Sequence, residues 1–559
     1  MRTLHRDDAP QVLELDLTEP PATVPPADPL ADPLTVIRTR RRPRLTDILI
    51  GLRRAATADE VAGIVIQVGG RGPGMALAQE LRAAIAEFRR GGKPVFAWAE
   101  TFGEFAPGNT GYAVAAGCDE VWVQESGDVG LTGIGTQPTF VRDALDRIGV
   151  TVQLGQRHEY KNAANMFTQQ ELTDGHRESL TRLVESLTDQ LLTGISNDRG
   201  LPVERLRELL DTGPLSPTEA AAAGLVDHIG YRDEVYAAMR RKVGGRMRLG
   251  FLHRFKPGLV RAGAARISTR GGVIALVHGT GAIGLGRSSR GPMGNGMGAT
   301  TVAAALRAAA RDEDVAAILF RVDSPGGSYA ASDTIRREVV LARQAGKPVV
   351  VSMGTVAGSG GYFVSMAADV IVASPGTLTG SIGVFGGKAV VDRLLDRAGI
   401  GTASVAQGEH ALMFSARQPY TDSELELLHR WLDRVYDDFV GKVAADRGMT
   451  VPQTHEVARG RIWTGADAAE RGLVDELGGL ATAVQLARTR GGLRARQDLA
   501  DVRNYPRVKP QDRLHAPRSS DDPGAASAAL GWGPLGQLAA RLGLPASGPL
   551  MMPDLLDPR

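Results

Sequence analysis

Short apolar runs alternate along the chain with longer amphipathic segments. Residues 64–68 and 349–352 are rich in β-branched side chains, whereas residues 75–89 and 331–343 are longer segments of Ala, Leu and Arg. Runs of the first kind are typical of buried strands, and segments of the second kind predict helices that cover a sheet. The alternation indicates βαβ units, and therefore an α/β fold with a largely parallel sheet.

The same pattern occurs twice in the chain. The sequence DEVAGIVIQV at residues 59–68 returns as EDVAAILFRV at 313–322, and GKPV at 92–95 returns at 346–349. Three more pairs follow in the same order: Gly111-Tyr112 with Gly361-Tyr362, DRIG at 146–149 with DRAG at 396–399, and GLVD at 224–227 with GLVD at 472–475. Five collinear matches predict two tandem copies of one α/β domain.

Shifts in composition set the expected domain boundaries. We expect an N-terminal repeat at 1–239, a basic linker at 240–270, a C-terminal repeat at 271–491 and a Pro/Gly-rich tail at 492–559. The linker is interpreted as solvated, with contact to anionic lipid heads as the alternative. Within the tail, residues 535–544 predict a short amphipathic helix that docks on a partner subunit or, alternatively, lies on a membrane surface.

Composition excludes several classes of function. The 559 residues are 43% hydrophobic and 23% charged, which is typical of a globular protein with more than one core. The formal charge of only +2 gives no electrostatic footprint of a nucleic-acid binder. Cys118 is the single cysteine and is expected to be buried, so no intramolecular disulfide or thiolate cluster can form. We expect neither a metal nor a cofactor.

The sequence shows no targeting or membrane-spanning segment. Acidic residues stand near the N-terminus where a signal peptide would need an apolar stretch, and no window reaches 18 uncharged apolar residues. We therefore expect a protein that is cytoplasmic or peripherally bound to a membrane.

The two copies differ at two glycine-rich turns. After its strand, the second copy has Asp323-Ser-Pro-Gly-Gly-Ser where the first has Gly-Gly-Arg-Gly, and Ser359 stands between glycines where the first copy has Asn109. A serine at a glycine-flanked strand-to-helix turn suits a nucleophile, and a Gly-Gly loop can aim a backbone N–H at a developing oxyanion. Each motif alone is equally consistent with a tight turn, but their occurrence together in one copy favours catalysis.

A serine nucleophile also needs a base to remove its proton. His410 lies in the second copy, roughly where the first copy has Tyr160, and is one candidate. The other is Lys161, because a buried lysine can lose its proton at neutral pH and form a Ser-Lys dyad. The residues alone leave both bases open.

Five motifs carry a resemblance to a known family. They are Asp323-Ser-Pro-Gly-Gly, Gly358-Ser-Gly-Gly-Tyr362, Leu378-Thr-Gly-Ser-Ile-Gly383, Tyr160-Lys161 and Trp463-Thr-Gly-Ala-Asp-Ala468. At these residues the chain resembles the signal peptide peptidase A (protease IV) family, in its double-length bacterial form, over roughly residues 12–490. The resemblance implies two tandem repeats of a ClpP/crotonase-like domain.

The resemblance also implies roles for individual residues. Ser359 would be the nucleophile, Lys161 the general base, and Ser381 a hydrogen-bonding partner close to the lysine. The first copy has LTGIG at 131–135 and lacks that third residue. The backbone N–H groups of Gly360 and Gly327 would form the oxyanion hole, with the glycine before Gly327 as the alternative.

The implied activity is that of a serine endopeptidase with a Ser-Lys dyad. Its substrates would be cleaved signal peptides or other apolar or unfolded peptides, and it would form a homo-oligomer, a tetramer in the double-length type. Two alternatives are a crotonase-like acyl-CoA enzyme and a catalytically silent peptide-binding scaffold. Labelling by a fluorophosphonate separates the first alternative from a peptidase, and a scaffold has no reason to keep Ser359, Lys161 and Ser381 together.

Overall fold

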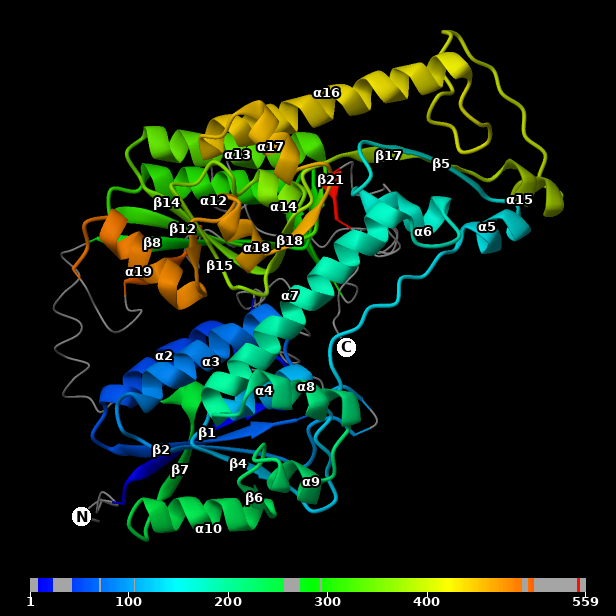
Figure 1. Ribbon diagram of the computed structural model, residues 1–559. Coiled ribbons are helices and arrows are strands. Elements are labelled where there is room, and N and C mark those ends of the chain that lie inside the picture. Colours follow the sequence, from blue (N-terminus) through cyan, green and yellow to red (C-terminus); the bar gives the residue numbers. More distant parts are fainter. Residues whose placement is uncertain are drawn as a thin grey trace.

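Two α/β repeats are stacked on each other in the computed structural model of the chain (Figure 1). The structure describes residues 9–23, 43–69, 72–104, 106–255, 272–291, 294–494, 501–506 and 550–552. The expected α/β class and its tandem repetition are confirmed.

The first repeat is built on a six-stranded sheet in which every pair of neighbours is parallel. In spatial order the strands are β6 (His228–Ile229), β4 (Glu120–Val123), β3 (Val95–Ala99), β2 (Val61–Val68), β1 (Gln11–Leu17) and β7 (Arg248–Phe251). The helices are α2 (Leu45–Thr57), α3 (Met75–Arg89), α4 (Asn109–Ala116), α5 (Arg142–Ile148), α6 (Asn165–Thr168), α7 (Asp174–Arg199), α8 (Val203–Thr212), α9 (Pro217–Ala222) and α10 (Arg232–Lys242), with 3-10 turns η1 (Asn162–Ala164) and η2 (Leu252–Arg254).

The second repeat has an eight-stranded sheet of the same kind, in which only the β16–β18 pair is antiparallel. Its main path is β18 (Ile462–Thr464), β16 (Leu378–Gly380), β14 (Val349–Gly358), β12 (Val315–Ser324), β8 (Val273–Thr280) and β20 (Val502–Asn504), with β15 (Val370–Ala373) on β14 and β19 (Glu476–Leu477) on β15. Its helices are α12 (Ala299–Arg311), α13 (Tyr329–Gln344), α14 (Gly360–Phe363), α15 (Asp392–Arg397), α16 (Asp422–Arg447), α17 (Val451–Val457), α18 (Gly465–Glu470) and α19 (Leu480–Arg490).

A smaller five-stranded sheet lies beside the second repeat. Its order is β10 (Ser289–Gly291), β11 (Gly294–Gly298), β9 (Ala282–Gly284), β13 (Gly326–Gly327) and β21 (Leu550–Met551). The C-terminal strand β21 therefore pairs with the Gly-Gly segment that the sequence singles out.

Each repeat contains an equivalent tyrosine hydrogen bond. Tyr112 donates its hydroxyl to the Leu225 carbonyl at 2.7 Å, and Tyr362 donates to the Leu473 carbonyl at 3.1 Å. Both tyrosines belong to the repeated Gly-Tyr pair and both rings are buried. The helices α7 and α16 also correspond, because each has 26 residues, begins at a threonine cap and ends at a glycine with positive φ. The sequence repeat is thus a structural repeat.

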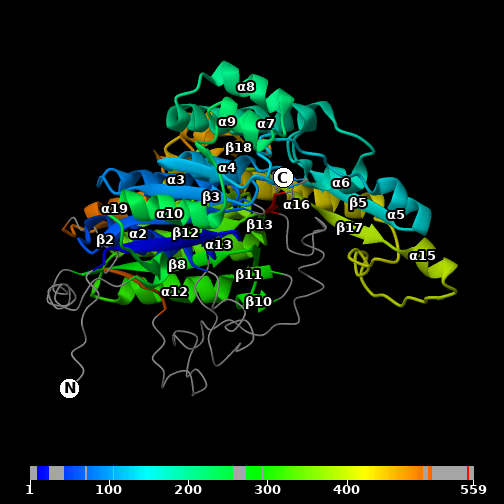
Figure 2. The ribbon, with the colours of Figure 1, turned by 90° about the horizontal axis from the view of Figure 1, so that it is seen from below.

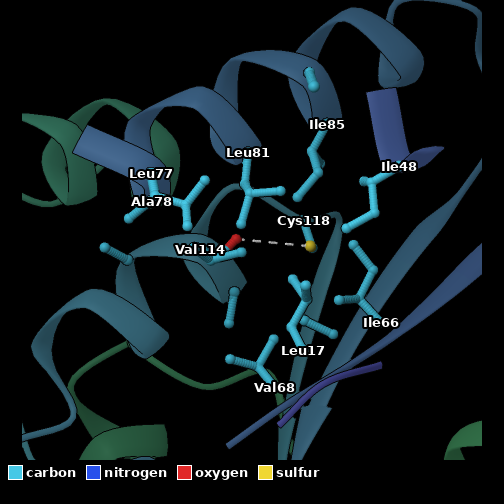
Figure 3. Close-up of a cluster of buried hydrophobic side chains, with 14 of the residues drawn as sticks. Leu17, Ile48, Ile66, Val68, Leu77, Ala78, Leu81, Ile85, Val114 and Cys118 are labelled. Atoms are coloured by element: carbon cyan, nitrogen blue, oxygen red, sulfur yellow. Dashed lines mark hydrogen bonds between the residues drawn. The ribbon is translucent and has the colours of Figure 1, made fainter. Parts of the chain in front are cut away.

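One apolar core joins the two repeats. It contains residues from α2, α3 and the first sheet, together with Leu480 and Val484 of α19 and the inner face of the second sheet. Cys118 belongs to this core and is buried as expected, with Sγ 3.9 Å from the Val114 carbonyl (Figure 3). Burial raises the pKa of its thiol, so Cys118 is a packing residue rather than a nucleophile.

Part of the segment expected as a linker belongs to the first repeat. Helix α10 ends at Lys242, and β7 then adds to the sheet next to β1. Residues 256–271 and the predicted helix at 535–544 lie outside the described residues.

An arm projects from the stacked repeats (Figures 1 and 2). We define it as residues 142–160 and 385–416, one segment from each repeat. Strand β5 (Thr151–Gln156) pairs antiparallel with β17 (Phe385–Val390) over six residues, and α5 and α15 lie at its outer end. The chain returns from β5 to the body of the molecule immediately before Lys161.

Candidate active site

Ser359 stands at the turn between β14 and α14. Its backbone has φ 54° and ψ −112°, a region that non-glycine residues rarely occupy. The Ser359 N–H donates to the Gly380 carbonyl at 2.8 Å, which fixes the turn against β16. Such a turn directs the side chain away from the sheet, because strand and helix leave it in opposite directions.

Lys161 reaches this serine from the other repeat. Its Nζ lies 2.8 Å from Ser359 Oγ, although the two residues are 198 positions apart in the chain. The same nitrogen lies 2.9 Å from the Ser381 carbonyl oxygen and 3.0 Å from Ser381 Oγ. All three residues have an exposed fraction of 0%. The structure therefore brings together the three side chains that the sequence predicts for the site.

Burial favours the neutral form of Lys161. Desolvation lowers the pKa of its ammonium well below the ordinary value of 10.5, because a charged amine loses its hydration inside the protein. The three oxygens around Nζ belong to serines and carry no formal charge. A neutral amine has a lone pair that can accept the Ser359 hydroxyl proton.

Two glycine segments meet next to Ser359. A Cβ at Gly360 would lie 3.0 Å from the Gly327 nitrogen, so the start of α14 and strand β13 are in direct contact. Gly326 and Gly327 have φ of 106° and 154°, which a side chain rarely tolerates. The Gly326 N–H donates to Ser324 Oγ at 3.1 Å.

The segment around Gly460, for which the sequence predicted no role, packs against the backbone of Lys161. A Cβ at Gly460 would lie 2.5 Å from the Lys161 nitrogen, and the Gly460 N–H donates to the Ile382 carbonyl at 2.7 Å. The carbonyl of Arg461, the next residue, accepts the Ser381 N–H at 2.7 Å. The Arg461 guanidinium pairs with Glu178 of α7 at 2.7 Å. A glycine between two arginines, just before the Trp-Thr-Gly motif, was the available signal.

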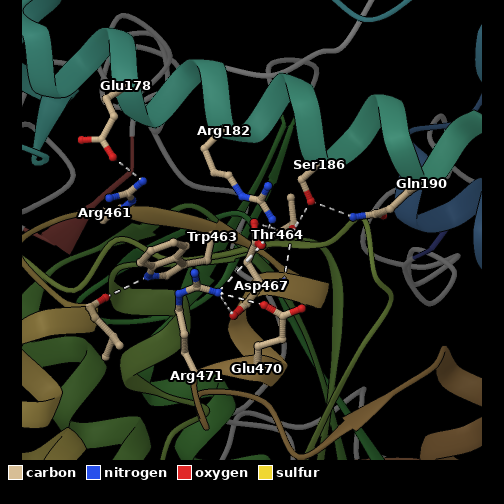
Figure 4. Close-up of polar contacts among 11 residues, drawn as sticks. Glu178, Arg182, Ser186, Gln190, Arg461, Trp463, Thr464, Asp467, Glu470 and Arg471 are labelled. Atoms are coloured by element: carbon tan, nitrogen blue, oxygen red, sulfur yellow. Dashed lines mark hydrogen bonds and ion pairs between the residues drawn. The ribbon is translucent and has the colours of Figure 1, made fainter. Parts of the chain in front are cut away.

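Helix α7 fixes the first repeat to this region of the second (Figure 4). Arg182 pairs with the buried carboxylate of Asp467 at 2.5 Å, and Ser186 Oγ lies 2.9 Å from Thr464 Oγ1. Both partners belong to the Trp-Thr-Gly-Ala-Asp-Ala motif. The motif therefore serves as an attachment point between α7 of the first repeat and the second repeat.

His410 takes no part in these contacts. It lies between α15 and α16, its Nε2 is 3.9 Å from Glu409 Oε1, and within the described residues it forms no hydrogen bond with Ser359. In the first repeat, the Asn109 side chain accepts the N–H groups of Thr132 and Gly133 at 3.0 and 3.1 Å. At the position that corresponds to Ser359, the first repeat therefore has a side chain that makes structural hydrogen bonds to the backbone.

A comparison with protein families settles the assignment. The sequence model of peptidase family S49 matches residues 87–245 and 341–494, which is more than half of the chain and one region in each repeat. The chain belongs to peptidase family S49. This confirms the resemblance stated from the sequence and the enzyme class, a serine peptidase.

Curated relatives agree with the S49 assignment. The chain is 32% identical over 457 residues to "Protease 4" of Salmonella typhi, covering 79% of this chain and 71% of the relative. It is 28% identical over 443 residues to "Serine protease SPPA, chloroplastic" of Arabidopsis thaliana, covering 79% of this chain and 64% of the relative. "Protease 4" of Haemophilus influenzae is 29% identical, with 79% and 72% covered.

Solved structures also align with this S49 peptidase. The ClpP1 N165D mutant from Listeria monocytogenes matches 40% of this chain and 99% of its own, at 16% identity and a TM-score of 0.23. At that score the alignment adds nothing to the assignment.

Among the described residues, no helix is long and apolar enough to cross a bilayer.

Proposed function

We propose that this S49 peptidase cleaves peptides with a Ser-Lys dyad formed by Ser359 and Lys161. The observation that carries the proposal is the 2.8 Å approach of Lys161 Nζ to Ser359 Oγ inside a fully buried site. Ser381 is the positioning residue, since both of its oxygens contact the amine. Lys161 takes the place of the Asp-His pair of a catalytic triad, and its burial lowers the pKa of the amine, which favours the neutral form that a base needs.

The proposed reaction has two halves. Ser359 Oγ attacks the peptide carbonyl carbon while its proton passes to Lys161 Nζ, and collapse of the tetrahedral intermediate breaks the C–N bond as the new ammonium protonates the leaving amine. Water then attacks the carbonyl carbon of the acyl-enzyme and gives a proton to the Lys161 amine. The second collapse releases the carboxylic acid product and returns the proton to Ser359.

Backbone amides would stabilise the oxyanion in both halves. The Gly360 N–H follows the nucleophile directly, and the Gly327 N–H approaches from β13. The Gly326 N–H already donates to Ser324 Oγ, which favours Gly327 as the second donor.

The substrates are proposed to be apolar or unfolded peptides, including cleaved signal peptides. Val356 lies on β14 just before Ser359, opposite Leu378 on the neighbouring strand β16. Together with Leu183 of α7 and Ile462 of β18, they belong to a small apolar cluster. Apolar walls beside a nucleophile favour apolar substrate side chains.

We also propose that the chain forms a homo-oligomer, a tetramer as the family resemblance implies. The support in the structure is the arm, which exposes five large apolar side chains to solvent: Ile148, Leu394, Ile400, Val405 and Phe414. Apolar side chains gathered on a projecting element are typical of an association surface.

The nucleophile is tested by the Ser359→Ala variant. It should lose labelling by a fluorophosphonate probe and hydrolysis of denatured casein, because the Ser359 hydroxyl oxygen is the atom proposed to form the acyl-enzyme. Ser365→Ala is the matched control: this serine is equally buried, but its hydroxyl donates to the Gly361 carbonyl at 2.7 Å. Casein hydrolysis by Ser359→Ala at the wild-type rate would remove this serine from the mechanism.

A further inference from the structure

The backbone of Arg461 holds Ser381. Arg461 lies between Gly460 and the first residue of β18, and its carbonyl accepts the Ser381 N–H at 2.7 Å. Ser381 has φ 51°, a conformation that non-glycine residues rarely adopt and that persists only where the surroundings hold it. The Arg461 carbonyl is therefore one of the contacts that keep Ser381 in place.

The side chain of Arg461 contacts the first repeat. Its guanidinium pairs with Glu178 of α7 at 2.7 Å (Figure 4), and its Cζ lies 4.8 Å from the centre of the Tyr160 ring. Tyr160 donates its hydroxyl to Glu178 at 2.5 Å, which closes a set of three mutual contacts. The guanidinium also lies 4.5 Å from the centre of the Trp463 ring. These contacts fix the residue that immediately precedes Lys161.

The neighbouring glycine packs against the stem of Lys161. A Cβ at Gly460 would lie 2.6 Å from the Lys161 Cβ, and a Cβ at Gly383 would lie 3.2 Å from the Lys161 Cδ. The stem therefore has two glycine backbones against it and little room to absorb a movement of residues 459–461. Such a movement would be passed on to the Lys161 amine.

A second ion pair joins α7 to the second repeat away from the base. Arg182 lies one helical turn after Glu178 and pairs with Asp467 at 2.5 Å. Among the described residues, the hydrogen bond and the ion pair of the Arg182 side chain both go to Asp467. Comparing the two pairs thus separates docking of the repeats from placement of the lysine.

We propose that Arg461 is a further positioning residue of this peptidase, because it joins the Tyr160-Lys161 segment to Ser381. Its side chain holds the segment and its carbonyl holds the serine, so together they set the distance between Lys161 Nζ and Ser359 Oγ. This inference rests on the proposed function. Placement has a large effect on rate, since a displacement of about 1 Å can cost about 100-fold.

The Arg461→Ala variant of the full-length chain tests the proposal. With a fluorogenic Leu/Ala-rich peptide as substrate, kcat should fall about 10- to 100-fold while KM changes less than about twofold. The rate constant for fluorophosphonate labelling should fall with kcat. Arg182→Ala is the matched control and should keep kcat within about twofold of wild type. Equal losses in the two variants would mean that Arg461 only docks the repeats, and an unchanged kcat in Arg461→Ala would also overturn the proposal.

The pH profile is a readout that a loss of folded enzyme does not move. A Lys161 amine displaced from its buried position regains water, which raises its pKa toward the ordinary value. The midpoint of kcat/KM against pH should therefore move to higher pH in Arg461→Ala and stay in place in Arg182→Ala. The ionisable side chains around the segment are His158, Glu159, Tyr160, Glu178, Tyr436, His455, Arg459 and Arg461.

Glu178→Ala distinguishes positioning from a direct effect of charge. Loss of a nearby positive charge raises the pKa of a lysine, whereas loss of a nearby negative charge lowers it. If Arg461 and Glu178 act by positioning, both alanine variants should move the midpoint to higher pH. Midpoints that move in opposite directions would overturn the proposal. The Glu178 side chain is 53% exposed, so this variant keeps the test valid even if Arg461→Ala folds poorly.

The double variant shows whether the two residues act through one set of contacts. Arg461→Ala combined with Glu178→Ala should lose no more kcat than Arg461→Ala alone. Losses that multiply would mean that the residues act independently, and the positioning route through α7 would have to be given up.

Failure of the proposed function is a separate result. It would appear as casein hydrolysis by Ser359→Ala at the wild-type rate, whatever Arg461→Ala does. If Ser359→Ala is inactive while Arg461→Ala keeps the wild-type kcat and pH midpoint, only the positioning role is overturned.

Discussion

Lys161 is held in a site that favours its neutral form. Its amine is fully buried, and among the described residues its hydrogen-bond partners are serine oxygens, which carry no charge to compensate an ammonium. Burial lowers the pKa of the amine, and a lower pKa means that the free base is present at lower pH than for an ordinary lysine. The desolvation that lowers this pKa also makes the residue useful as a base.

Activity should therefore rise with pH through the lowered pKa of Lys161 and reach a plateau above it, as measured by kcat/KM against pH. Lys161→Arg should be inactive across the range, because a guanidinium stays protonated. Lys388→Arg is the control: burial lowers the pKa of this lysine too, but its Nζ donates to the Met413 carbonyl in the arm. An active Lys161→Arg chain would show that position 161 supplies only positive charge.

The sequence predicts the side chains that meet in the proposed site better than it predicts their surroundings. Comparing the two copies isolates Ser359, because a nucleophile is needed in only one of them. The choice between Lys161 and His410 stays open on residues alone, because it depends on a contact with Ser359, which is 198 positions away from Lys161 in the chain. The contact of Gly460 with Lys161 depends on such long-range packing too, and no local pattern reports it.

At the scale of elements, α3 carries a buried ion pair between the repeats. Glu80 of α3 pairs with Arg321 of β12 at 2.7 Å, and their side chains are 2% and 5% exposed. Glu80 also accepts the N–H of Leu480 at the start of α19. Removing one partner would leave the other charge buried and unpaired.

Glu80→Ala should lower the free energy of unfolding by about 3–5 kcal/mol, measured by urea denaturation. Glu87→Ala, on the same helix, is the matched control. Glu87 is 41% exposed and lies 3.7 Å from Arg53, so its loss should cost less than about 1 kcal/mol. Equal effects of the two substitutions would mean that the repeats are held together by apolar packing alone.

The strands and helices themselves follow closely from the sequence pattern. The apolar run at 64–68 lies within β2, and the segment at 331–343 lies within α13. Strand β7 was missed because Arg248–Phe251 stands in a basic, glycine-rich stretch, and it is recruited by pairing with β1 rather than by its own apolar pattern.

At the scale of the molecule, the arm should govern assembly. Phe414 is 82% exposed in the segment between α15 and α16, and Ile400 is exposed in the same segment, just after α15. The double variant Phe414→Asp with Ile400→Asp should lower the mass of the particle measured by light scattering, because each charge opposes burial in an interface. Leu285→Asp, at a site 72% exposed outside the arm, should leave the mass unchanged. An unchanged mass for the arm variant would place the association surface elsewhere.

The cross-repeat contact between Lys161 and Ser359 also has a genetic consequence. In an enzyme whose active site is shared between subunits, two differently inactivated alleles can rescue each other, because mixed particles contain some intact sites. Here both halves of the dyad are encoded in one reading frame and meet within one chain. Coexpressed Ser359→Ala and Lys161→Arg chains should therefore show no complementation in a casein assay, and one defective copy should silence only its own site while its neighbours in the particle go on working.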